Sequence, residues 1–353
     1  MTYRALLLTD TPEFSAQVTE LDTLPEGDVE LHIDYATLNY KDALAITNKS
    51  PIVRTWPMVA GIDAAGVVAH STHAAFQPGD AVVLNGWGLS ETRWGGLAQR
   101  TRAPGDWLVK LPARSSRSPG RPKNDLAPSG GGSDVFSEPG AQMSPRDAAA
   151  IGTAGYTAAL CVQALERHGL TPADGPILVT GATGGVGSIA VALLARAGFE
   201  VHALTGKAAD HAYLKSLGAA EVLDRADFAA PGKPMQKERF AGVVDVLGSQ
   251  VLVNACAQVK RNGAVAACGL AMGMDFPASV APFILRGISL YGIDSVYASL
   301  ARRQAAWTLL AERLTSADLA GIAHEIALSE TLPAAEKMLA GQMTGRFVVD
   351  VNR

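Results

Sequence analysis

The sequence Ile177-Leu178-Val179-Thr180-Gly181-Ala182-Thr183-Gly184-Gly185-Val186-Gly187 decides the fold. Four apolar or β-favouring residues lead into a glycine cluster, and apolar residues then recur at helical spacing as far as Ala197, which predicts a buried strand, a tight turn and an amphipathic helix. Glycines at such a junction let the backbone approach a pyrophosphate, whose charge is held by free N–H groups at the helix start. The stretch therefore predicts a dinucleotide-binding unit, and an ordinary βα turn is the alternative. The residues expected to line the pyrophosphate are Thr183, Gly184, Gly185 and Val186.

A second predicted strand, residues 200–204, ends in Thr205-Gly206-Lys207. A fold that prefers NAD usually places an Asp or Glu at about this distance to accept the ribose 2′-hydroxyl, and none stands there. A hydroxyl and a lysine suit a 2′-phosphate instead. The alternative for Lys207 is a solvated side chain in a surface loop. The sequence thus favours NADPH over NADH, held by Thr205, Gly206 and Lys207.

The bulk properties are those of a two-domain α/β enzyme. The chain has 353 residues, of which 48% are hydrophobic, and it contains 36 glycines. A net charge of −4 gives no reason to expect a nucleic acid or an anionic membrane as partner. The first apolar run is too short for a signal peptide or a membrane span. The three cysteines show neither a disulfide framework nor metal spacing, which favours the cytoplasm.

The N-terminal third predicts a small β-barrel-like module that ends near residue 112. Short strands are expected over residues 3–8, 29–35, 66–69 and 81–84, without long helices between them. Residues 113–142 are dominated by Ser, Pro, Gly and Arg and show no period. Such a run buries too little apolar surface to offset its ordering entropy, so a flexible insertion is predicted there.

The remaining chain predicts a parallel sheet followed by helices. Ser144-Pro145 predicts a helix start, with the helix running to Leu165 and interrupted at Gly152 and Gly155. Further strands are expected over residues 221–223, 242–246, 263–268 and 288–293. A helical face between Leu300 and Leu314, a helix over 333–341 and a strand over 346–351 complete the pattern.

Several motifs carry a family resemblance. They are Leu38-Asn39-Tyr40-Lys41-Asp42-Ala43-Leu44, Gly61-Ile62-Asp63-Ala64-Ala65-Gly66, Gly86-Trp87-Gly88, Gly95-Gly96-Leu97-Ala98, the run 151–158 and Cys268-Gly269-Leu270-Ala271. The sequence resembles the medium-chain dehydrogenase/reductase superfamily, and within it the zinc-independent, NADPH-dependent acrylyl-CoA reductase branch of the quinone-oxidoreductase-like enzymes. The resemblance covers nearly the whole chain except the 113–142 stretch.

The resemblance implies a doubly wound parallel (Rossmann) sheet inserted into a GroES-like β-barrel domain. The implied parts are residues 1–112 and 294–353 for the catalytic domain, 113–142 for the insertion and 143–293 for the NADPH-binding domain. The active site would lie in the cleft between the two domains, outside the carboxyl ends of the parallel strands. Relatives pair through the last strand of that sheet, so a homodimer is expected through residues 288–293.

Zinc ligands are missing where the family's alcohol dehydrogenases carry them. The matching places hold Asn39-Tyr40-Lys41-Asp42 and Gly61-Ile62-Asp63, without Cys or His, so no metal site is predicted. The expected hydride acceptor is therefore an already activated double bond, such as that of an α,β-unsaturated acyl-CoA.

Three residues are candidates for the chemistry. Tyr40 is expected to position the substrate and to donate the proton, with a purely steric role beside the nicotinamide as the alternative. Asp42 is expected to order the loop around it. Arg346, in a Gly-Arg motif of the last strand, is expected to face the cofactor or the thioester oxygen, or else to be a solvated charge. The resemblance also places the backbone of Leu270 near the nicotinamide.

The predicted function is NADPH-dependent reduction of acrylyl-CoA to propionyl-CoA. A quinone or enone reductase of broader specificity is the alternative enzyme, and a non-catalytic NADPH-binding sensor is the alternative of another class. The sequence does not locate the coenzyme A pocket. Four arginines are available to bind the coenzyme A phosphates, and nothing in the sequence chooses among them: Arg54, Arg93, Arg302 and Arg303. Four dispersed histidines are expected to be structural or exposed: His168, His202, His211 and His324.

Overall fold

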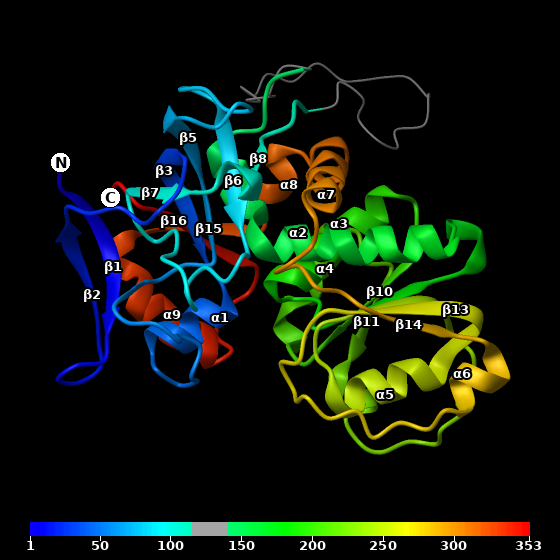
Figure 1. Ribbon diagram of the computed structural model, residues 1–353. Helices are drawn as coiled ribbons and strands as arrows, with labels where there is room; N and C mark the ends of the chain where they lie inside the picture. The colour runs from blue at the N-terminus through cyan, green and yellow to red at the C-terminus, as the bar shows by residue number, and fades with distance from the viewer. Residues whose placement is uncertain (115–139) are drawn as a thin grey trace, which may run out of the picture.

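The central part of the chain forms a six-stranded parallel sheet. The computed structural model describes residues 1–114 and 140–353, and this sheet occupies its lower right in Figure 1. The strand order is β11-β10-β9-β12-β13-β14, and every neighbouring pair is parallel. The strands are β9 (Ile177–Thr180), β10 (Val201–Thr205), β11 (Glu221–Asp224), β12 (Phe240–Asp245), β13 (Val259–Ala267) and β14 (Ser289–Gly292). The predicted parallel sheet is confirmed.

Both faces of this sheet are covered, because its strands are apolar on both sides. Successive residues of a strand point to opposite faces. In β9, Val179 packs into a core with the helices α2, α3 and α7, whereas Leu178 packs into a separate core with α5. The helices of this part are α2 (Pro145–His168), α3 (Gly185–Arg196), α4 (His211–Ser216), α5 (Ser249–Gln258), α6 (Ala281–Arg286) and α7 (Leu300–Arg313). The sheet is thus doubly wound.

The β-rich half contains two further sheets (Figure 1, upper left). The larger has the order β15-β16-β3-β5-β6-β8, with β7 also paired to β3, and the smaller has the order β2-β1-β4. Strands of the larger sheet are β3 (Val29–Leu38), β5 (Asp63–Ser71), β6 (Ala81–Asn85), β7 (Arg100–Ala103), β8 (Leu108–Lys110), β15 (Ala323–Ala327) and β16 (Arg346–Asp350). The smaller consists of β1 (Tyr3–Thr9), β2 (Ser15–Leu21) and β4 (Met58–Val59), and the helices of this half are α1 (Tyr40–Ile46), α8 (Ser316–Ala320) and α9 (Thr331–Leu339).

The end of the chain returns to the β-rich half. Strand β16 pairs antiparallel with β3, with Phe347 opposite Leu38. The nucleotide-type sheet is therefore inserted between the first strands of the larger β-sheet and its last two. The numerical domain boundaries given above stay a prediction.

Helix α2 joins the two halves and contains one backbone break. Ser144 caps it, its hydroxyl accepting from the N–H of Asp147 at 3.1 Å, as the sequence predicted. Gly152 leaves the helical conformation (φ 49°, ψ −162°). Only glycine suits this place, because a Cβ there would collide with the Arg346 guanidinium and would lie 2.9 Å from Thr37 Oγ1. The predicted second interruption, at Gly155, is wrong, since only Gly152 departs from helical geometry. The helix is long and apolar enough to cross a bilayer, but 89% of its most apolar window is buried inside the protein.

The predicted insertion lies mostly outside the described residues, which omit 115–139. Its two ends are part of the fold, in contrast to the expectation of a flexible segment over the whole of 113–142. Ala113 and Gln142 form a β-bridge. Arg114 is buried, and its Nη2 donates to Asp147 Oδ2 at 2.7 Å. A buried ion pair with α2 thus fixes Arg114, near the beginning of the predicted insertion.

Candidate active site

The glycine turn lies between β9 and α3, as predicted. Gly184 is the N-cap of α3 and supplies no side-chain cap, so the first N–H groups of the helix are left for another acceptor. A Cβ on Gly187 would collide with the Gly181 carbonyl oxygen, so the turn can close this tightly only with glycine there. Thr183, Gly184, Gly185 and Val186 all stand at this start of α3.

The segment after β10 approaches a second cation that sequence reasoning missed. Thr205 is buried, and its Oγ1 accepts from the Lys207 N–H at 3.1 Å. The Lys207 ammonium donates to the Met343 carbonyl. A Cβ on Gly206 would lie 2.8 Å from Nη2 of Arg225. Two cations, Lys207 and Arg225, therefore flank Gly206, where a 2′-phosphate is expected.

The signal for Arg225 was present in the sequence. Parallel strands end at the same edge of a sheet, and the register pairs Thr205 of β10 with Asp224 of β11. Residue 225 therefore follows β11 at the same level at which Gly206 follows β10. The 2′-phosphate site predicted above rests only on the loop after β10.

The carboxyl edge of the parallel sheet continues where β12 and β13 end. Asp245, the last residue of β12, accepts from Thr180 Oγ1 at 2.7 Å and from the Gly248 N–H at 2.8 Å. Burial raises the pKa of Asp245 above its usual range. These bonds fix the turn between β12 and α5, next to which Leu270 follows β13 with 59% of its surface exposed. Leu270 thus lies open to solvent at the carboxyl edge of the sheet.

The part of the site in the β-rich half begins at α1, where Asp42 forms a capping box with Asn39. Asp42 Oδ2 accepts from the Asn39 N–H at 2.8 Å, and its Oδ1 accepts from the Ile62 N–H at 2.9 Å. Burial, followed by the neighbouring Asp63 charge, raises the pKa of Asp42 to about 7. This geometry orders the loop around Tyr40, which is the role predicted for Asp42.

Tyr40 is the first residue of α1, and 51% of its surface is exposed. Its hydroxyl forms no hydrogen bond with the residues that the structure describes, so this donor is free to meet a ligand.

Arg346 is buried, so the alternative of a solvated strand-end charge is wrong. Only 3% of its surface is exposed, and its Nη2 lies 3.3 Å from Asn39 Oδ1. Burial lowers the pKa of Arg346, and the charges of Asp63 and Asp42 oppose that shift. The guanidinium therefore lies among buried carboxylates.

Asp63 holds this buried group together, and sequence reasoning did not assign it a role. Its Oδ1 accepts from the Thr37 N–H at 3.0 Å, and its Oδ2 accepts from Asn39 Nδ2 at 3.0 Å and from the Thr153 N–H at 2.8 Å. The Thr153 bond is available because α2 breaks at Gly152. One carboxylate thus fixes β3, the start of α1 and the middle of α2.

Arg346 also connects this network to the glycine turn. The N–H of Gly345 donates to the Thr183 carbonyl at 3.0 Å, and a Cβ on Gly185 would lie 2.8 Å from Arg346 Nη1. Arg346 Nε is buried and has no partner among the described residues. An unpaired buried donor beside a glycine turn suits an oxygen acceptor of a bound ligand.

These features fit a phosphorylated dinucleotide cofactor. The glycine turn leaves backbone N–H groups for a pyrophosphate, Lys207 and Arg225 flank the place of a 2′-phosphate, and Arg346 Nε lacks an acceptor. Within residues 1–114 and 140–353, no three His, Cys, Asp or Glu side chains form a metal-binding group.

The cations considered for coenzyme A separate into two kinds. Arg303 is not available, because it is buried and its Nη1 donates to the Asn85 carbonyl at 2.7 Å. Arg54, Arg93 and Arg302 are exposed.

Of the histidines, His202 is buried between Glu200 and Glu221 on the sheet, and His168 contacts the Tyr291 hydroxyl at 2.8 Å, so both are structural.

Comparisons with known proteins agree with both halves of the fold. Residues 25–113 match the family model described as alcohol dehydrogenase GroES-like domain, and residues 185–314 match the one described as zinc-binding dehydrogenase. The chain is 46% identical over 338 residues to the probable acrylyl-CoA reductase AcuI of Escherichia coli strain K12, covering 96% of this chain and 95% of that protein. It is 39% identical over 341 residues to the putative quinone oxidoreductase YhfP of Bacillus subtilis strain 168, covering 96% and 95%.

A solved structure shows the same agreement in three dimensions. The YhdH oxidoreductase from Salmonella enterica, determined in complex with NADP, superposes with a TM-score of 0.89 at 44% identity. The alignment covers 98% of this chain and 99% of that one.

Proposed function

The chain belongs to the medium-chain dehydrogenase/reductase superfamily, and we propose that it uses NADPH to reduce the carbon–carbon double bond of an α,β-unsaturated acyl-CoA, most simply acrylyl-CoA to propionyl-CoA. The observation that carries the proposal is the 46% identity, over nearly the full length, to a relative named as a probable acrylyl-CoA reductase. The similarity to the putative quinone oxidoreductase keeps a quinone as the alternative substrate.

The residues that would hold NADPH lie along one edge of the parallel sheet. Thr183, Gly184, Gly185 and Val186 would receive the pyrophosphate at the start of α3. Thr205, Gly206 and Lys207, joined by Arg225, would receive the 2′-phosphate. Leu270 and Arg346 would border the nicotinamide end. When bound, NADPH supplies the hydride for the β-carbon of the substrate.

The opposite wall supplies hydrogen bonding and the proton. Reduction of a conjugated thioester places negative charge on the thioester oxygen, and donors aimed at that oxygen stabilise it. Tyr40 offers an unengaged hydroxyl at the start of α1, and Asp42 and Asn39 fix the backbone that carries it. Tyr40, or a water beside it, would deliver the proton to the α-carbon. In this proposal Asp42 is a positioning residue, because its oxygens are occupied by backbone N–H groups.

Parallel kinetics test this proposal. NADPH oxidation is followed with acrylyl-CoA, crotonyl-CoA and a simple quinone under the same conditions. The highest kcat/KM is expected with acrylyl-CoA. If the quinone is turned over faster than either thioester, the protein is a quinone reductase and the proposal is wrong. NADPH binding without turnover of any of the three would favour a sensor.

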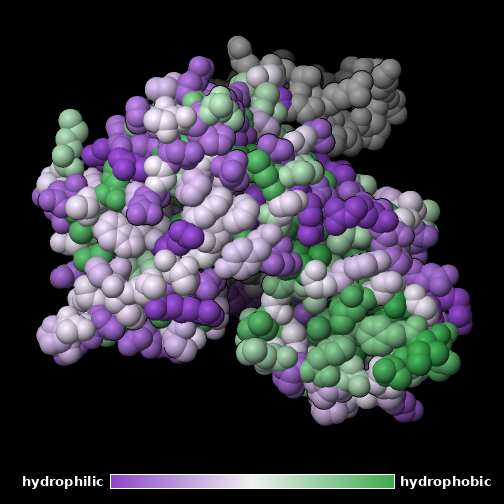
Figure 2. Space-filling model, in the orientation of Figure 1, coloured by the Kyte–Doolittle hydropathy of each residue, from purple (hydrophilic) through white to green (hydrophobic). Residues whose placement is uncertain are grey.

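We also propose a homodimer in the cytoplasm. Strand β14 ends the parallel sheet with one edge unpaired in the described chain, and the neighbouring α6 exposes Ile284 and Leu285 by 73% and 58%. Figure 2 shows apolar surface gathered at the lower right, over the part of the molecule that carries α5 and α6 in Figure 1. A second copy would cover both the edge and the apolar side chains. The three free cysteines suit a reducing compartment.

A further inference from the structure

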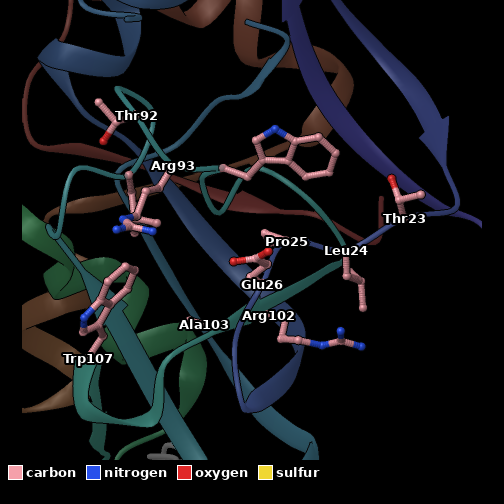
Figure 3. A pocket seen from close by; sticks show the side chains of 11 residues that line it. Thr23, Leu24, Pro25, Glu26, Thr92, Arg93, Arg102, Ala103 and Trp107 are labelled. Carbon is pink, nitrogen blue, oxygen red and sulfur yellow. The ribbon is translucent and has the colours of Figure 1, made fainter. Parts of the chain in front are cut away.

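A pocket with a volume of about 390 Å³ lies in the β-rich half (Figure 3), and no residue of the glycine turn lines it. Its walls come from three segments: the loop 23–26 before β3, the loop 89–94 after β6, and residues 102–107. None of these segments contains a residue that is assigned to NADPH above.

Two indole rings, those of Trp94 and Trp107, line the pocket next to an arginine without an acidic partner in the described part of the chain. Trp107 is held in place because it stacks on Trp87, with the ring centroids 5.7 Å apart and the planes at 10°. The guanidinium of Arg93 lies 4.7 Å from the Trp107 ring centroid. Among the described residues Arg93 has no acidic partner, whereas Arg102 on the opposite wall pairs with Glu30 at 3.1 Å. Arg93 is thus the cation available to an anion.

This combination of groups is typical of nucleotide recognition. Indole faces stack on a base, and a fork of guanidinium N–H groups matches a phosphate. Figure 3 shows the Glu26 carboxylate near the middle of the pocket, between Arg93 and Arg102. A carboxylate at that place can accept a hydrogen bond from an exocyclic amino group, as adenine offers.

The same loop borders the active-site cleft on its other side. Glu91, one residue before the pocket-lining Thr92, pairs with Lys41, one residue after Tyr40. At its beginning, the Trp87 N–H donates to the Val296 carbonyl at 3.1 Å, and a Cβ on Gly88 would lie 3.7 Å from the Tyr297 hydroxyl. The loop 86–92 therefore contacts the residues that follow Tyr40 and the segment 296–297, while its neighbours Thr92 and Arg93 line the pocket.

The backbone of this loop is held in a demanding conformation. Trp87 and Ser90 both have positive φ, 57° and 64°, which non-glycine residues rarely adopt. Such a conformation persists only where surrounding contacts impose it, and it is common at ligand sites. Here the Arg303 guanidinium, 4.4 Å from the Trp87 ring centroid, supplies one of those contacts.

We propose that this pocket binds the 3′-phosphoadenosine end of the acyl-CoA substrate. Adenine would lie beside the indole rings of Trp94 and Trp107, which line the pocket. The 3′-phosphate would pair with Arg93, and the pantetheine arm would cross the loop 86–92 to bring the thioester to Tyr40. The inference rests on the proposed function, because it takes coenzyme A as the carrier of the acyl group. It assigns Arg93 to substrate recognition and leaves Arg54 and Arg302 without a role there.

A truncated substrate tests the assignment. Kinetics are measured with acrylyl-CoA and with acrylyl-pantetheine, which keeps the thioester and lacks the nucleotide. Arg93→Ala should raise KM for acrylyl-CoA by roughly 10-fold or more, the effect of one charge-assisted contact, with kcat unchanged. The same variant should leave acrylyl-pantetheine kinetics unchanged. Arg302→Ala, which removes an exposed arginine outside the pocket, is the matched control and should alter neither substrate.

Direct binding separates this inference from the proposed function. Adenosine 3′,5′-bisphosphate is titrated by calorimetry into protein saturated with NADP⁺, so that the dinucleotide site is occupied. Binding that weakens by roughly 10-fold in Arg93→Ala supports the pocket even if no thioester is turned over. The inference is overturned if the bisphosphate does not bind, or if Arg93→Ala affects acrylyl-CoA and acrylyl-pantetheine equally or affects neither. Absence of turnover with both thioesters in the unaltered protein would contradict the proposed function alone.

Discussion

Replacing Arg346 by Gln is the most informative single change, because this side chain serves two parts of the site. The guanidinium lies between the carboxylates of Asp42 and Asp63 and the glycine turn, with 3% of its surface exposed. Arg346→Gln keeps some hydrogen bonding and removes the charge. It should therefore reduce both the stability of the free protein and its affinity for NADPH.

The loss of stability should depend on pH. The pKa of Asp42 is raised from 3.8 to about 7 in the folded protein, so at pH 5 this carboxyl is neutral and at pH 8 it is ionised beside Asp63. Because the pKa of Asp42 is higher in the folded than in the unfolded protein, the neutral carboxyl adds to the free energy of unfolding. This contribution is complete below pH 4 and is lost as the pH rises through 7. At pH 8 the variant leaves buried charge uncompensated, which costs about 3–5 kcal/mol. At pH 5 the cost should fall to about 1–3 kcal/mol, that of an unsatisfied polar group.

Thermal unfolding at the two pH values checks this expectation. The unfolding midpoint of Arg346→Gln should lie at least about 5 °C below that of the unaltered protein at pH 8, with a smaller difference at pH 5. Arg346→Lys keeps the charge and should recover most of the stability, yet it should still bind NADPH roughly 10-fold more weakly because it lacks the planar fork. Arg353→Gln removes an exposed arginine just after β16 and is the control. If Arg346→Gln lowers the unfolding midpoint equally at pH 5 and pH 8, the pH dependence inferred from Asp42 is wrong.

Three further predictions concern cofactor choice, proton transfer and assembly. Lys207→Ala and Arg225→Ala should each weaken NADPH binding by roughly 10- to 100-fold and leave NADH nearly unchanged, as fluorescence titration would show. Equal weakening of both cofactors would remove the 2′-phosphate assignment. Tyr40→Phe should lower kcat by roughly 10²–10⁴ with the NADPH Kd unchanged, and an unchanged kcat would leave water as the proton source. Ile284→Glu should convert the dimer to a monomer by light scattering, whereas a monomeric mass for the unaltered protein at micromolar concentration would exclude the dimer.

The strand, glycine turn and helix over residues 177–197 could be predicted from sequence because their signals are local. A buried strand, a glycine turn and a helix occur within residues 177–197, and a Cβ on Gly184 or on Gly187 would meet the Gly181 carbonyl oxygen of the same segment. The following strand and Lys207 come next in the chain. Arg225 was missed because its place depends on the pairing of two strands rather than on one loop.

The buried network could not be predicted, since its members are distant in sequence. Asp63 joins Thr37, Asn39 and Thr153, and the break in α2 exposes the N–H that it uses. Composition gives no sign of such a cluster, and charged residues are usually expected at the surface. The same expectation misled the sequence analysis for Arg303, which is one of the most buried side chains in the described structure.

The position of Arg346 beside the glycine turn follows from the register of one strand pair. Phe347 lies opposite Leu38 in the antiparallel pair β16–β3, so the residues just beyond, Arg346 and Asn39, meet where both strands reach the cleft. A shift of register by one residue would turn Arg346 to the other face of the sheet and separate it from the glycine turn. The last strand of the chain therefore does more than complete the β-rich half. It carries a buried guanidinium that reaches Gly185 of the glycine turn and the Asn39 cap of α1, close enough to Asp63 and Asp42 to feel their charges.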